Sequence, residues 1–212
     1  MDRRVRGALA ALAALAGAML SSGCAGEARP APAAGVRDWR SVATNDDRAR
    51  LRGWRDSWIV ALRALRTSGR QRELSSGGAL FDPDAARDGV TPPVGAYRCR
   101  VYKLGIKGST APGYAASPSH DCRIDRVGDV LHVSKVGGIQ RPAGILYPES
   151  DTRAVFLGTL VLGDETKALR YGQDATRDIA GVFERIGDAR WRLVLPAPAF
   201  QSRIDIVEFT PA

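Results

Sequence analysis

The chain has 212 residues, of which 44% are hydrophobic, and it carries a formal net charge of +8. This length supports one well-buried core, or at most two small domains. The positive charge is mostly arginine interleaved with acidic residues, and no RNA-recognition, zinc-finger or helix-turn-helix motif is present. The composition therefore favours a solvated basic surface over a nucleic-acid site.

The first 23 residues have the pattern of a secretory signal. Arginines at the start precede an uncharged run rich in Ala and Leu, from Gly7 to Leu20, and small residues follow it. A permanent membrane-spanning helix needs about 20 apolar residues, so this run is too short for one. The pattern predicts a signal peptide over residues 1–23 and export to the cell envelope.

Cys24 follows small residues directly, as in a lipoprotein signal whose cysteine becomes lipidated. The usual pattern has Leu three residues before the cysteine, whereas Ser21 stands there and Leu20 lies one place further back. We predict lipidation of Cys24, which would hold an outer-membrane lipoprotein facing the periplasm by its N-terminus. The alternative is ordinary cleavage just after Ala25 or further on, which would leave a soluble periplasmic or secreted protein.

Residues 24–44 are predicted to form a flexible tether, because they are rich in Pro and Ala and lack periodicity. Residues 45–212 are predicted to form a single domain that begins with a helix from Asn45 to Ser68, capped by Asn45. A single apolar stripe follows three- and four-residue steps along it: Leu51, Trp54, Trp58, Leu62 and Leu65. We expect this stripe to pack on the protein's own sheet, with a membrane surface as the alternative. A shorter helix is predicted from Gln71 to Leu80.

From Tyr97 onward, short alternating segments are separated by Gly, Pro or Asp, which is typical of strands. The predicted strands are 97–104, 122–127, 130–136, 139–147, 154–162, 179–186, 191–195 and 203–209. Eight strands at this spacing predict an antiparallel barrel, with a β-sandwich as the alternative. The strand 154–162 is apolar on both faces, so we expect the Trp54/Trp58 helix to lie across its outer face.

Two cysteines remain if Cys24 is used for lipid. Cys99 and Cys122 would then form an even pair in an oxidising compartment, which predicts a disulfide. The absence of a CxxC spacing and the scarcity of histidines argue against a redox or metal site. We expect no metal and no cofactor.

Several segments resemble one family. They are 95–100 (GAYRCR), 140–144 (QRPAG), 156–165 (FLGTLVLGDE) and 190–196 (RWRLVLP). Together they are similar to an uncharacterised bacterial family, domain of unknown function 4893, from about Arg48 to the C-terminus. The resemblance implies an exported protein and supplies no activity. The architecture is also similar to small envelope lipoproteins of the lipocalin-like, metalloprotease-inhibitor type, a likeness that does not fix function.

The connection from Gly163 to Arg177 is the longest break in the strand series, and it is polar with both signs of charge. We predict that this loop, together with Arg141 on the predicted strand 139–147, forms a binding rim. The candidate ligand-binding residues are Arg141, Asp164, Tyr171, Asp174 and Arg177. The alternative is an Asp–Arg network that only pins the loop.

Three functions stay open on this sequence. The preferred one is a non-catalytic module that binds a small ligand or a partner protein of the envelope. The second is a hydrolase-like enzyme that uses Asp174, Arg177 and Asp178, although no HExxH, GxSxG or P-loop motif is present. The third is a structural envelope protein.

The two histidines are not expected to be ligands. His120 is expected in a loop, and His132 is expected at a core or rim position.

Overall fold

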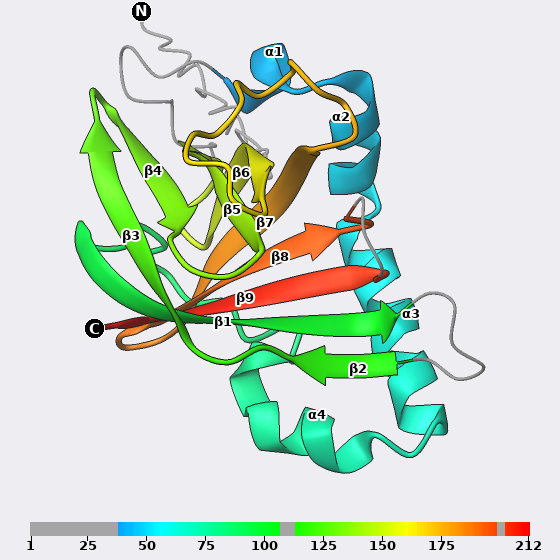
Figure 1. Ribbon diagram of the computed structural model, residues 1–212. Helices are drawn as coiled ribbons and strands as arrows, with labels where there is room; N and C mark the ends of the chain where they lie inside the picture. Colours follow the sequence, from blue (N-terminus) through cyan, green and yellow to red (C-terminus); the bar gives the residue numbers. More distant parts are fainter. Residues whose placement is uncertain (1–37, 107–112, 199–201) are drawn as a thin grey trace, which may run out of the picture.

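The computed structural model describes residues 38–106, 113–198 and 202–212. The predicted signal peptide, Cys24 and most of the predicted tether therefore lie outside the described residues. The described chain forms a β-barrel with helices packed along one side (Figure 1). The helical elements come first: α1 (Trp39–Val42), α2 (Asn45–Arg52), α3 (Trp54–Thr67), α4 (Gln71–Gly77) and the 3-10 turn η1 (Gly78–Leu80).

The strands follow in the second part of the chain. They are β1 (Gly95–Ile106), β2 (Gly113–Ala116), β3 (His120–Val127), β4 (Val130–Lys135), β5 (Gln140–Pro148), β6 (Arg153–Leu162), β7 (Asp178–Gly187), β8 (Arg190–Pro196) and β9 (Ile204–Pro211). All eight predicted strands are present close to their predicted bounds, and β2 is the one that was not predicted. The helix predicted over residues 71–80 is present as α4 and η1.

The barrel closes through β1, which pairs with β9 on one edge and with β3 on the other. Around the ring, the strands otherwise follow chain order and every neighbour is antiparallel. The predicted eight-stranded antiparallel barrel is therefore confirmed over the β-sandwich. The short strand β2 continues the line of β3 along the second half of β1, where Lys103 lies opposite Ala115.

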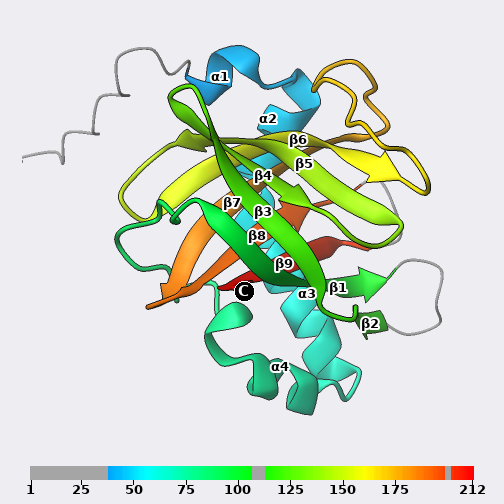
Figure 2. The ribbon, with the colours of Figure 1, turned by 60° about the vertical axis from the view of Figure 1, so that its left-hand side comes forward.

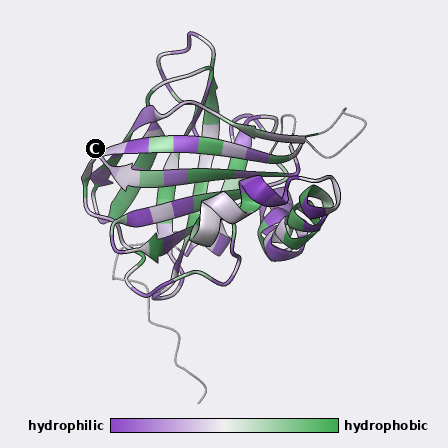
Figure 3. Cartoon of the chain, turned by 90° about the horizontal axis from the view of Figure 1, so that it is seen from below, coloured by the Kyte–Doolittle hydropathy of each residue, from purple (hydrophilic) through white to green (hydrophobic). Residues whose placement is uncertain are grey.

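Residues along each strand alternate between the interior and the exterior of the barrel, and Figure 3 shows the resulting bands of hydropathy. Phe156, Phe183 and Phe209 are buried in the interior. At one end, the Tyr97 hydroxyl donates a hydrogen bond to the carbonyl of Pro93 at 2.7 Å, and Val90 joins the same cluster. Aromatic side chains and the segment before β1 therefore fill this end, which we call the closed end.

The predicted disulfide joins Cys99 and Cys122, with Cα atoms 5.9 Å apart. Both cysteines are buried inside the barrel. Cys99 lies opposite His120 and Cys122 lies opposite Tyr97, so the bond runs diagonally between neighbouring pairs of β1 and β3. It covalently links the first barrel strand to the next one around the ring.

The helices cover the outer faces of several neighbouring strands. Helix α3 lies mainly against β1, β8 and β9, and α2 lies against β7; α1 and α2 stand at one end of this layer and α4 at the other (Figure 2). The stripe predicted on the helix is buried, with Trp58 fully enclosed. The predicted partner strand β6 belongs to the covered face, because its outward-facing Val155 and Leu157 lie in the same buried cluster as Trp54 and Trp58, and Arg153 at its start lies 5.1 Å from the Trp54 ring centre. The helix is not centred on β6, however, since its main contacts are with β1, β8 and β9.

Two boundaries near the N-terminus also differ from the prediction. Gly53 separates α2 from α3, so the single helix predicted from Asn45 to Ser68 is divided. The cap of α2 is Thr44, whose hydroxyl accepts a hydrogen bond from the Asp47 amide at 3.2 Å. The fold begins before the predicted start at residue 45, because the buried Trp39 donates its indole hydrogen to Glu149 at 2.5 Å.

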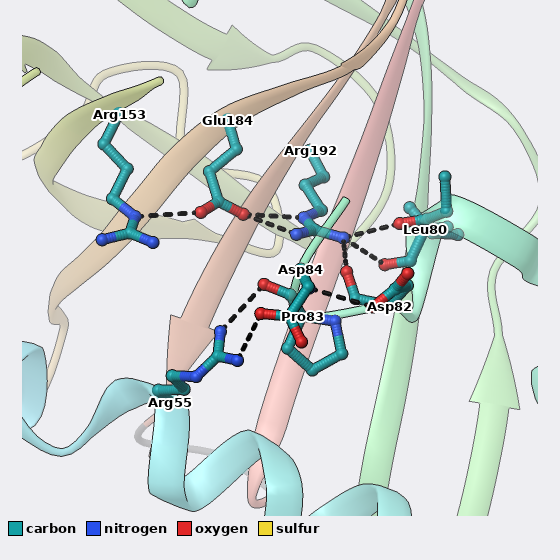
Figure 4. A network of polar contacts seen from close by, with 9 residues as sticks. Arg55, Leu80, Asp82, Pro83, Asp84, Arg153, Glu184 and Arg192 are labelled. Carbon is teal, nitrogen blue, oxygen red and sulfur yellow. Dashed lines mark hydrogen bonds and ion pairs between the residues drawn. The ribbon is translucent and has the colours of Figure 1, made fainter. Parts of the chain in front are cut away.

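A buried ionic network attaches the segment after α4 to the barrel wall (Figure 4). Arg192 donates from Nε and Nη2 to Glu184 at 2.9 and 2.7 Å, and both side chains are 0% exposed. Its remaining nitrogen donates to the carbonyls of Ala79, Leu80 and Asp82. Because each buried charge has partners, the network fixes the path of this segment rather than leaving a reactive group.

Candidate functional site

A cavity of about 400 Å³ occupies the end of the barrel opposite the closed end. Each of the eight barrel strands contributes at least one inward-facing residue to it. They are Val101, Lys103, His120, Lys135, Gln140, Pro142, Leu160, Ile179, Leu195, Asp205 and Val207. Ile139 lies at its mouth and is 77% exposed. We call this the open-end cavity.

The inner part of the open-end cavity is apolar. Leu160, Ile179, Leu195 and Val207 come from four successive strands and are themselves buried. Small-molecule sites in proteins are concave, mostly apolar and hold a few polar groups, with volumes of roughly 300–1,000 Å³. The open-end cavity has this character and has room for one small molecule.

Lys135 is the principal polar group of the open-end cavity. Its side chain is buried at the end of β4, and its ammonium donates to the carbonyl of Gly137 and, at 3.3 Å, to that of Gln140. Burial lowers the pKa of Lys135 to about 8, and the positive charges of Arg141 and Lys103 act in the same direction. No carboxylate within the described residues is bonded to it. The charged form of this lysine is therefore poorly compensated by the protein.

Lys103 and Asp205 form the other ionic pair of the open-end cavity. They lie opposite each other on β1 and β9, with Nζ and Oδ2 3.0 Å apart. The Ser202 hydroxyl donates to the second carboxylate oxygen of Asp205. Burial raises the pKa of Asp205, while Lys103 opposes that shift. The two charges compensate each other, so they add no net charge to the cavity.

His120 and the turn between β4 and β5 form one side of the mouth. Gly138 has φ +85°, and a Cβ at this position would lie 2.7 Å from the Lys135 Nζ and 3.3 Å from the His120 ring. A larger residue would therefore meet both side chains. Burial lowers the pKa of His120, and Lys135 and Arg98 add to that effect, so the imidazole is neutral at pH 7. The predicted loop position of His120 is corrected, because it is the first residue of β3.

The five residues predicted as a binding rim lie at the same end of the barrel as the cavity, but they do not line it. Arg141 points away and donates to the carbonyls of Gly138, Gly163 and Glu165 at 2.6, 2.7 and 2.6 Å. These bonds tie the turn after β4 to the loop after β6. Arg141 thus has a clear structural role, and its role in binding stays a prediction.

The loop between β6 and β7 is held by its own ion pairs and by α2. Arg177 contacts Glu165 at 2.5 Å and Asp174 at 3.3 Å. The Tyr171 hydroxyl donates to Asp47 of α2 at 2.6 Å, and burial raises the pKa of Tyr171 to about 12. Asp164 is exposed.

Asp178, which the hydrolase alternative uses, and the acidic residue Glu184 both have structural partners. Asp178 is buried, and its carboxylate accepts the Gly172 amide at 3.0 Å. Glu184 lies apart from the loop, in the buried pair with Arg192. The described residues contain no group of His, Cys, Asp or Glu side chains placed to hold a metal ion.

The family described as domain of unknown function DUF4893 matches residues 39–209. The chain belongs to this family. No curated protein and no solved structure matches it. No helix within the described ranges is long and apolar enough to cross a membrane.

Sequence reasoning missed the open-end cavity, although the DUF4893 sequence carries a signal for it. Lys135 shares its strand parity with Leu131 and Val133, which places a charged residue on an apolar face. Lys103 and Asp205 have the same property in β1 and β9. Charged residues on the inward face of three strands indicate a polar site inside a barrel, once the barrel is assumed.

Proposed function

We propose that this protein is a non-catalytic binding module that holds one small, largely apolar molecule in the open-end cavity. The observation that carries the proposal is the cavity itself, with an apolar inner part and contributions from all eight barrel strands. Eight-stranded barrels are wide enough to hold one small ligand. A purely structural barrel would have both ends filled with side chains, as the closed end is.

The alternative of a hydrolase-like enzyme has less support. Its proposed acid–base residues, Asp174 and Asp178, already accept hydrogen bonds from the loop itself, through Thr176 and Gly172. Arg177 is engaged by Glu165 and Asp174. General acid–base groups need reach to a substrate, and none of these three side chains lines the open-end cavity.

We further propose that a lipid on Cys24 holds the binding barrel at the outer membrane, facing the periplasm, with residues 25–37 as the spacer. The proposal rests on the basic start, short apolar run and small residues before Cys24. Labelled fatty acid should be incorporated into the wild-type protein and not into Cys24→Ala. A wild-type protein that takes up no label would exclude the lipid anchor.

The binding proposal is tested with three probes that share an eight-carbon chain: octanoate, 1-octanol and octylamine. Titration calorimetry on purified protein should show saturable binding of at least one of them, with one molecule per chain. Val101→Trp places an indole in the cavity and should abolish binding. Val127→Trp makes the same change at an exposed position near the closed end and should leave binding intact. The proposal fails if none of the probes binds, or if Val101→Trp binds as wild type does.

A further inference from the structure

We infer that the ligand is an amphiphile with a single negative charge, a carboxylic acid whose carboxylate contacts Lys135 and whose apolar body fills the open-end cavity. This inference rests on the proposed function, because it names the chemical class of the molecule held at the same site.

The charge of the open-end cavity is unbalanced by one positive unit. Four of its lining side chains can ionise: Lys103, His120, Lys135 and Asp205. Lys103 and Asp205 neutralise each other across 3.0 Å, and the imidazole is neutral at pH 7. The remaining charge is the ammonium of Lys135, with Arg141 adding further positive potential. A buried charge without an opposite charge is costly, and an anionic ligand would remove that cost.

Lys135 also has one N–H donor that no acceptor within the described residues satisfies. A lysine ammonium has three N–H donors. Two of them go to the carbonyls of Gly137 and Gln140, and the described residues supply no acceptor for the third. The side chain is only 7% exposed and lines the cavity, so bulk water does not surround this donor. A carboxylate in the cavity would supply both the missing acceptor and the missing charge.

The cavity favours a monoanion over a phosphate ester. A phosphate monoester carries about −1.5 to −2 charges and three acceptor oxygens at pH 7. The open-end cavity offers one uncompensated cation, and the carboxylate of Asp205 among its lining residues would repel a second negative charge. A carboxylate carries one charge and matches the single ammonium.

Size limits the apolar body. If each water-sized group takes about 30 Å³, the 400 Å³ of the cavity holds on the order of a dozen non-hydrogen atoms. Medium-chain carboxylic acids, and aromatic acids of similar size, are within this limit. Their apolar part would contact the aliphatic side chains of Leu160, Ile179 and Leu195, where burial of each CH₂ group favours binding.

The three eight-carbon probes separate this inference from the proposed function. The affinity for octanoate should be higher than that for 1-octanol by about tenfold or more, because a hydrogen bond to a charged group is stronger than a hydrogen bond between neutral groups. Octylamine should bind least, since it adds a second cation beside Lys135. If 1-octanol or octylamine binds as tightly as octanoate, the anionic class is wrong while the binding function stands. If none of the probes binds, the binding function itself is wrong.

Lys135→Met provides the residue-specific test. It should reduce octanoate affinity to that of 1-octanol and leave the affinity for 1-octanol nearly unchanged. Arg126→Met removes one positive charge from an exposed position at the other end of the same hairpin, and it should preserve the wild-type preference. Retained octanoate preference in Lys135→Met would overturn the inference.

A proton-linked measurement tests the same contact without mutation. Binding of a carboxylate beside Lys135 favours its charged form, so the complex takes up protons where the free lysine is partly deprotonated. At pH 8, near the pKa of about 8, uptake should be about half a proton per octanoate bound. Calorimetry in two buffers of different ionisation enthalpy measures this number. An uptake of zero at pH 8 with tight octanoate binding would place the carboxylate away from Lys135.

Discussion

The guanidinium carbon of Arg192 lies 4.5 Å from the centre of the Trp58 ring, in the contact between helix α3 and strand β8. The arginine also donates to Glu184 and to three backbone carbonyls, so its charge is engaged on several sides. The pair joins the apolar stripe of the helix to the polar network on the barrel wall. Loss of either residue would therefore affect both layers.

Trp58→Ala should lower the free energy of unfolding by about 3–5 kcal/mol, because it leaves a large cavity and removes the ring below Arg192. Denaturant unfolding without membranes measures this. Ile59→Ala changes the next residue, which is 37% exposed, and should have a much smaller effect. Unchanged stability of Trp58→Ala, together with a loss of liposome binding, would favour a membrane-facing helix instead.

Glu184→Gln should destabilise the protein by about 3–5 kcal/mol, because the buried Arg192 loses the carboxylate to which it is bonded while keeping its charge. Asp121→Asn is the matched control, since Asp121 pairs with Arg98 at an exposed position on β3. That change should have little effect on stability. Equal effects of the two substitutions would show that burial does not set the strength of these pairs.

The stability of the protein should depend on pH through Lys135. Its pKa is lowered from 10.5 to about 8 in the folded state, so between these values the unfolded chain binds more protons. Stability attributable to this lysine therefore rises with pH from about 8 to 10.5 and is lowest below pH 8. Lys135→Met should be more stable than wild type by about 3 kcal/mol at pH 7, with the difference shrinking towards pH 10. The free energy of unfolding of both proteins, measured from pH 7 to pH 10, tests the direction of this pH dependence. A difference between the two proteins that stays constant with pH would contradict the prediction.

Arg141→Ala and Asp174→Ala test the rim predicted from the sequence. Arg141 holds two loops through three carbonyls, so its loss should cost about 1–2 kcal/mol of stability. Asp174 has 33% of its side chain exposed and pairs with Arg177 at 3.3 Å, so its loss should matter less. If octanoate binding survives in both variants, these residues only hold the loop. If binding is lost while the melting temperature is unchanged, the predicted rim is correct.

The disulfide should be present in the mature protein. Alkylation without reductant, followed by mass spectrometry, should leave Cys99 and Cys122 unmodified. A variant with both cysteines replaced by alanine should unfold with a free energy lower by about 2–5 kcal/mol, the usual range for exported domains. Two alkylated cysteines in the untreated protein would exclude the bond.

Local sequence patterns were sufficient for most of the fold. Alternation and the Gly-Asp turns define the eight barrel strands, because each signal lies within a few neighbouring residues. Strand β2 was missed because residues 113–116 (GYAA) show no alternation of apolar and polar residues. The break at Gly53 was missed because the apolar stripe continues across it.

The site was harder to predict because it depends on long-range topology. Leu160 and Leu195 belong to strands that were predicted correctly, but only closure of the ring brings them to the same cavity. The length and charge of the loop 163–177 predicted a binding rim, but its ion pairs are internal to the loop. Lys135 lies in a predicted strand. Its place on the inward face of that strand, among apolar residues, was the available indication of a polar site inside the barrel.

Closure of the barrel also limits the ways in which another protein chain can bind to this one. β1 is paired on both sides, and every other barrel strand in the described residues has two neighbours. Only β2, which is four residues long, lacks a second partner among them. Recognition by strand addition, in which an extended peptide bonds to an open sheet edge, therefore has almost no backbone to use. A protein that recognises this barrel would have to contact its side chains and loops, and the same closure protects the chain from sheet-to-sheet aggregation.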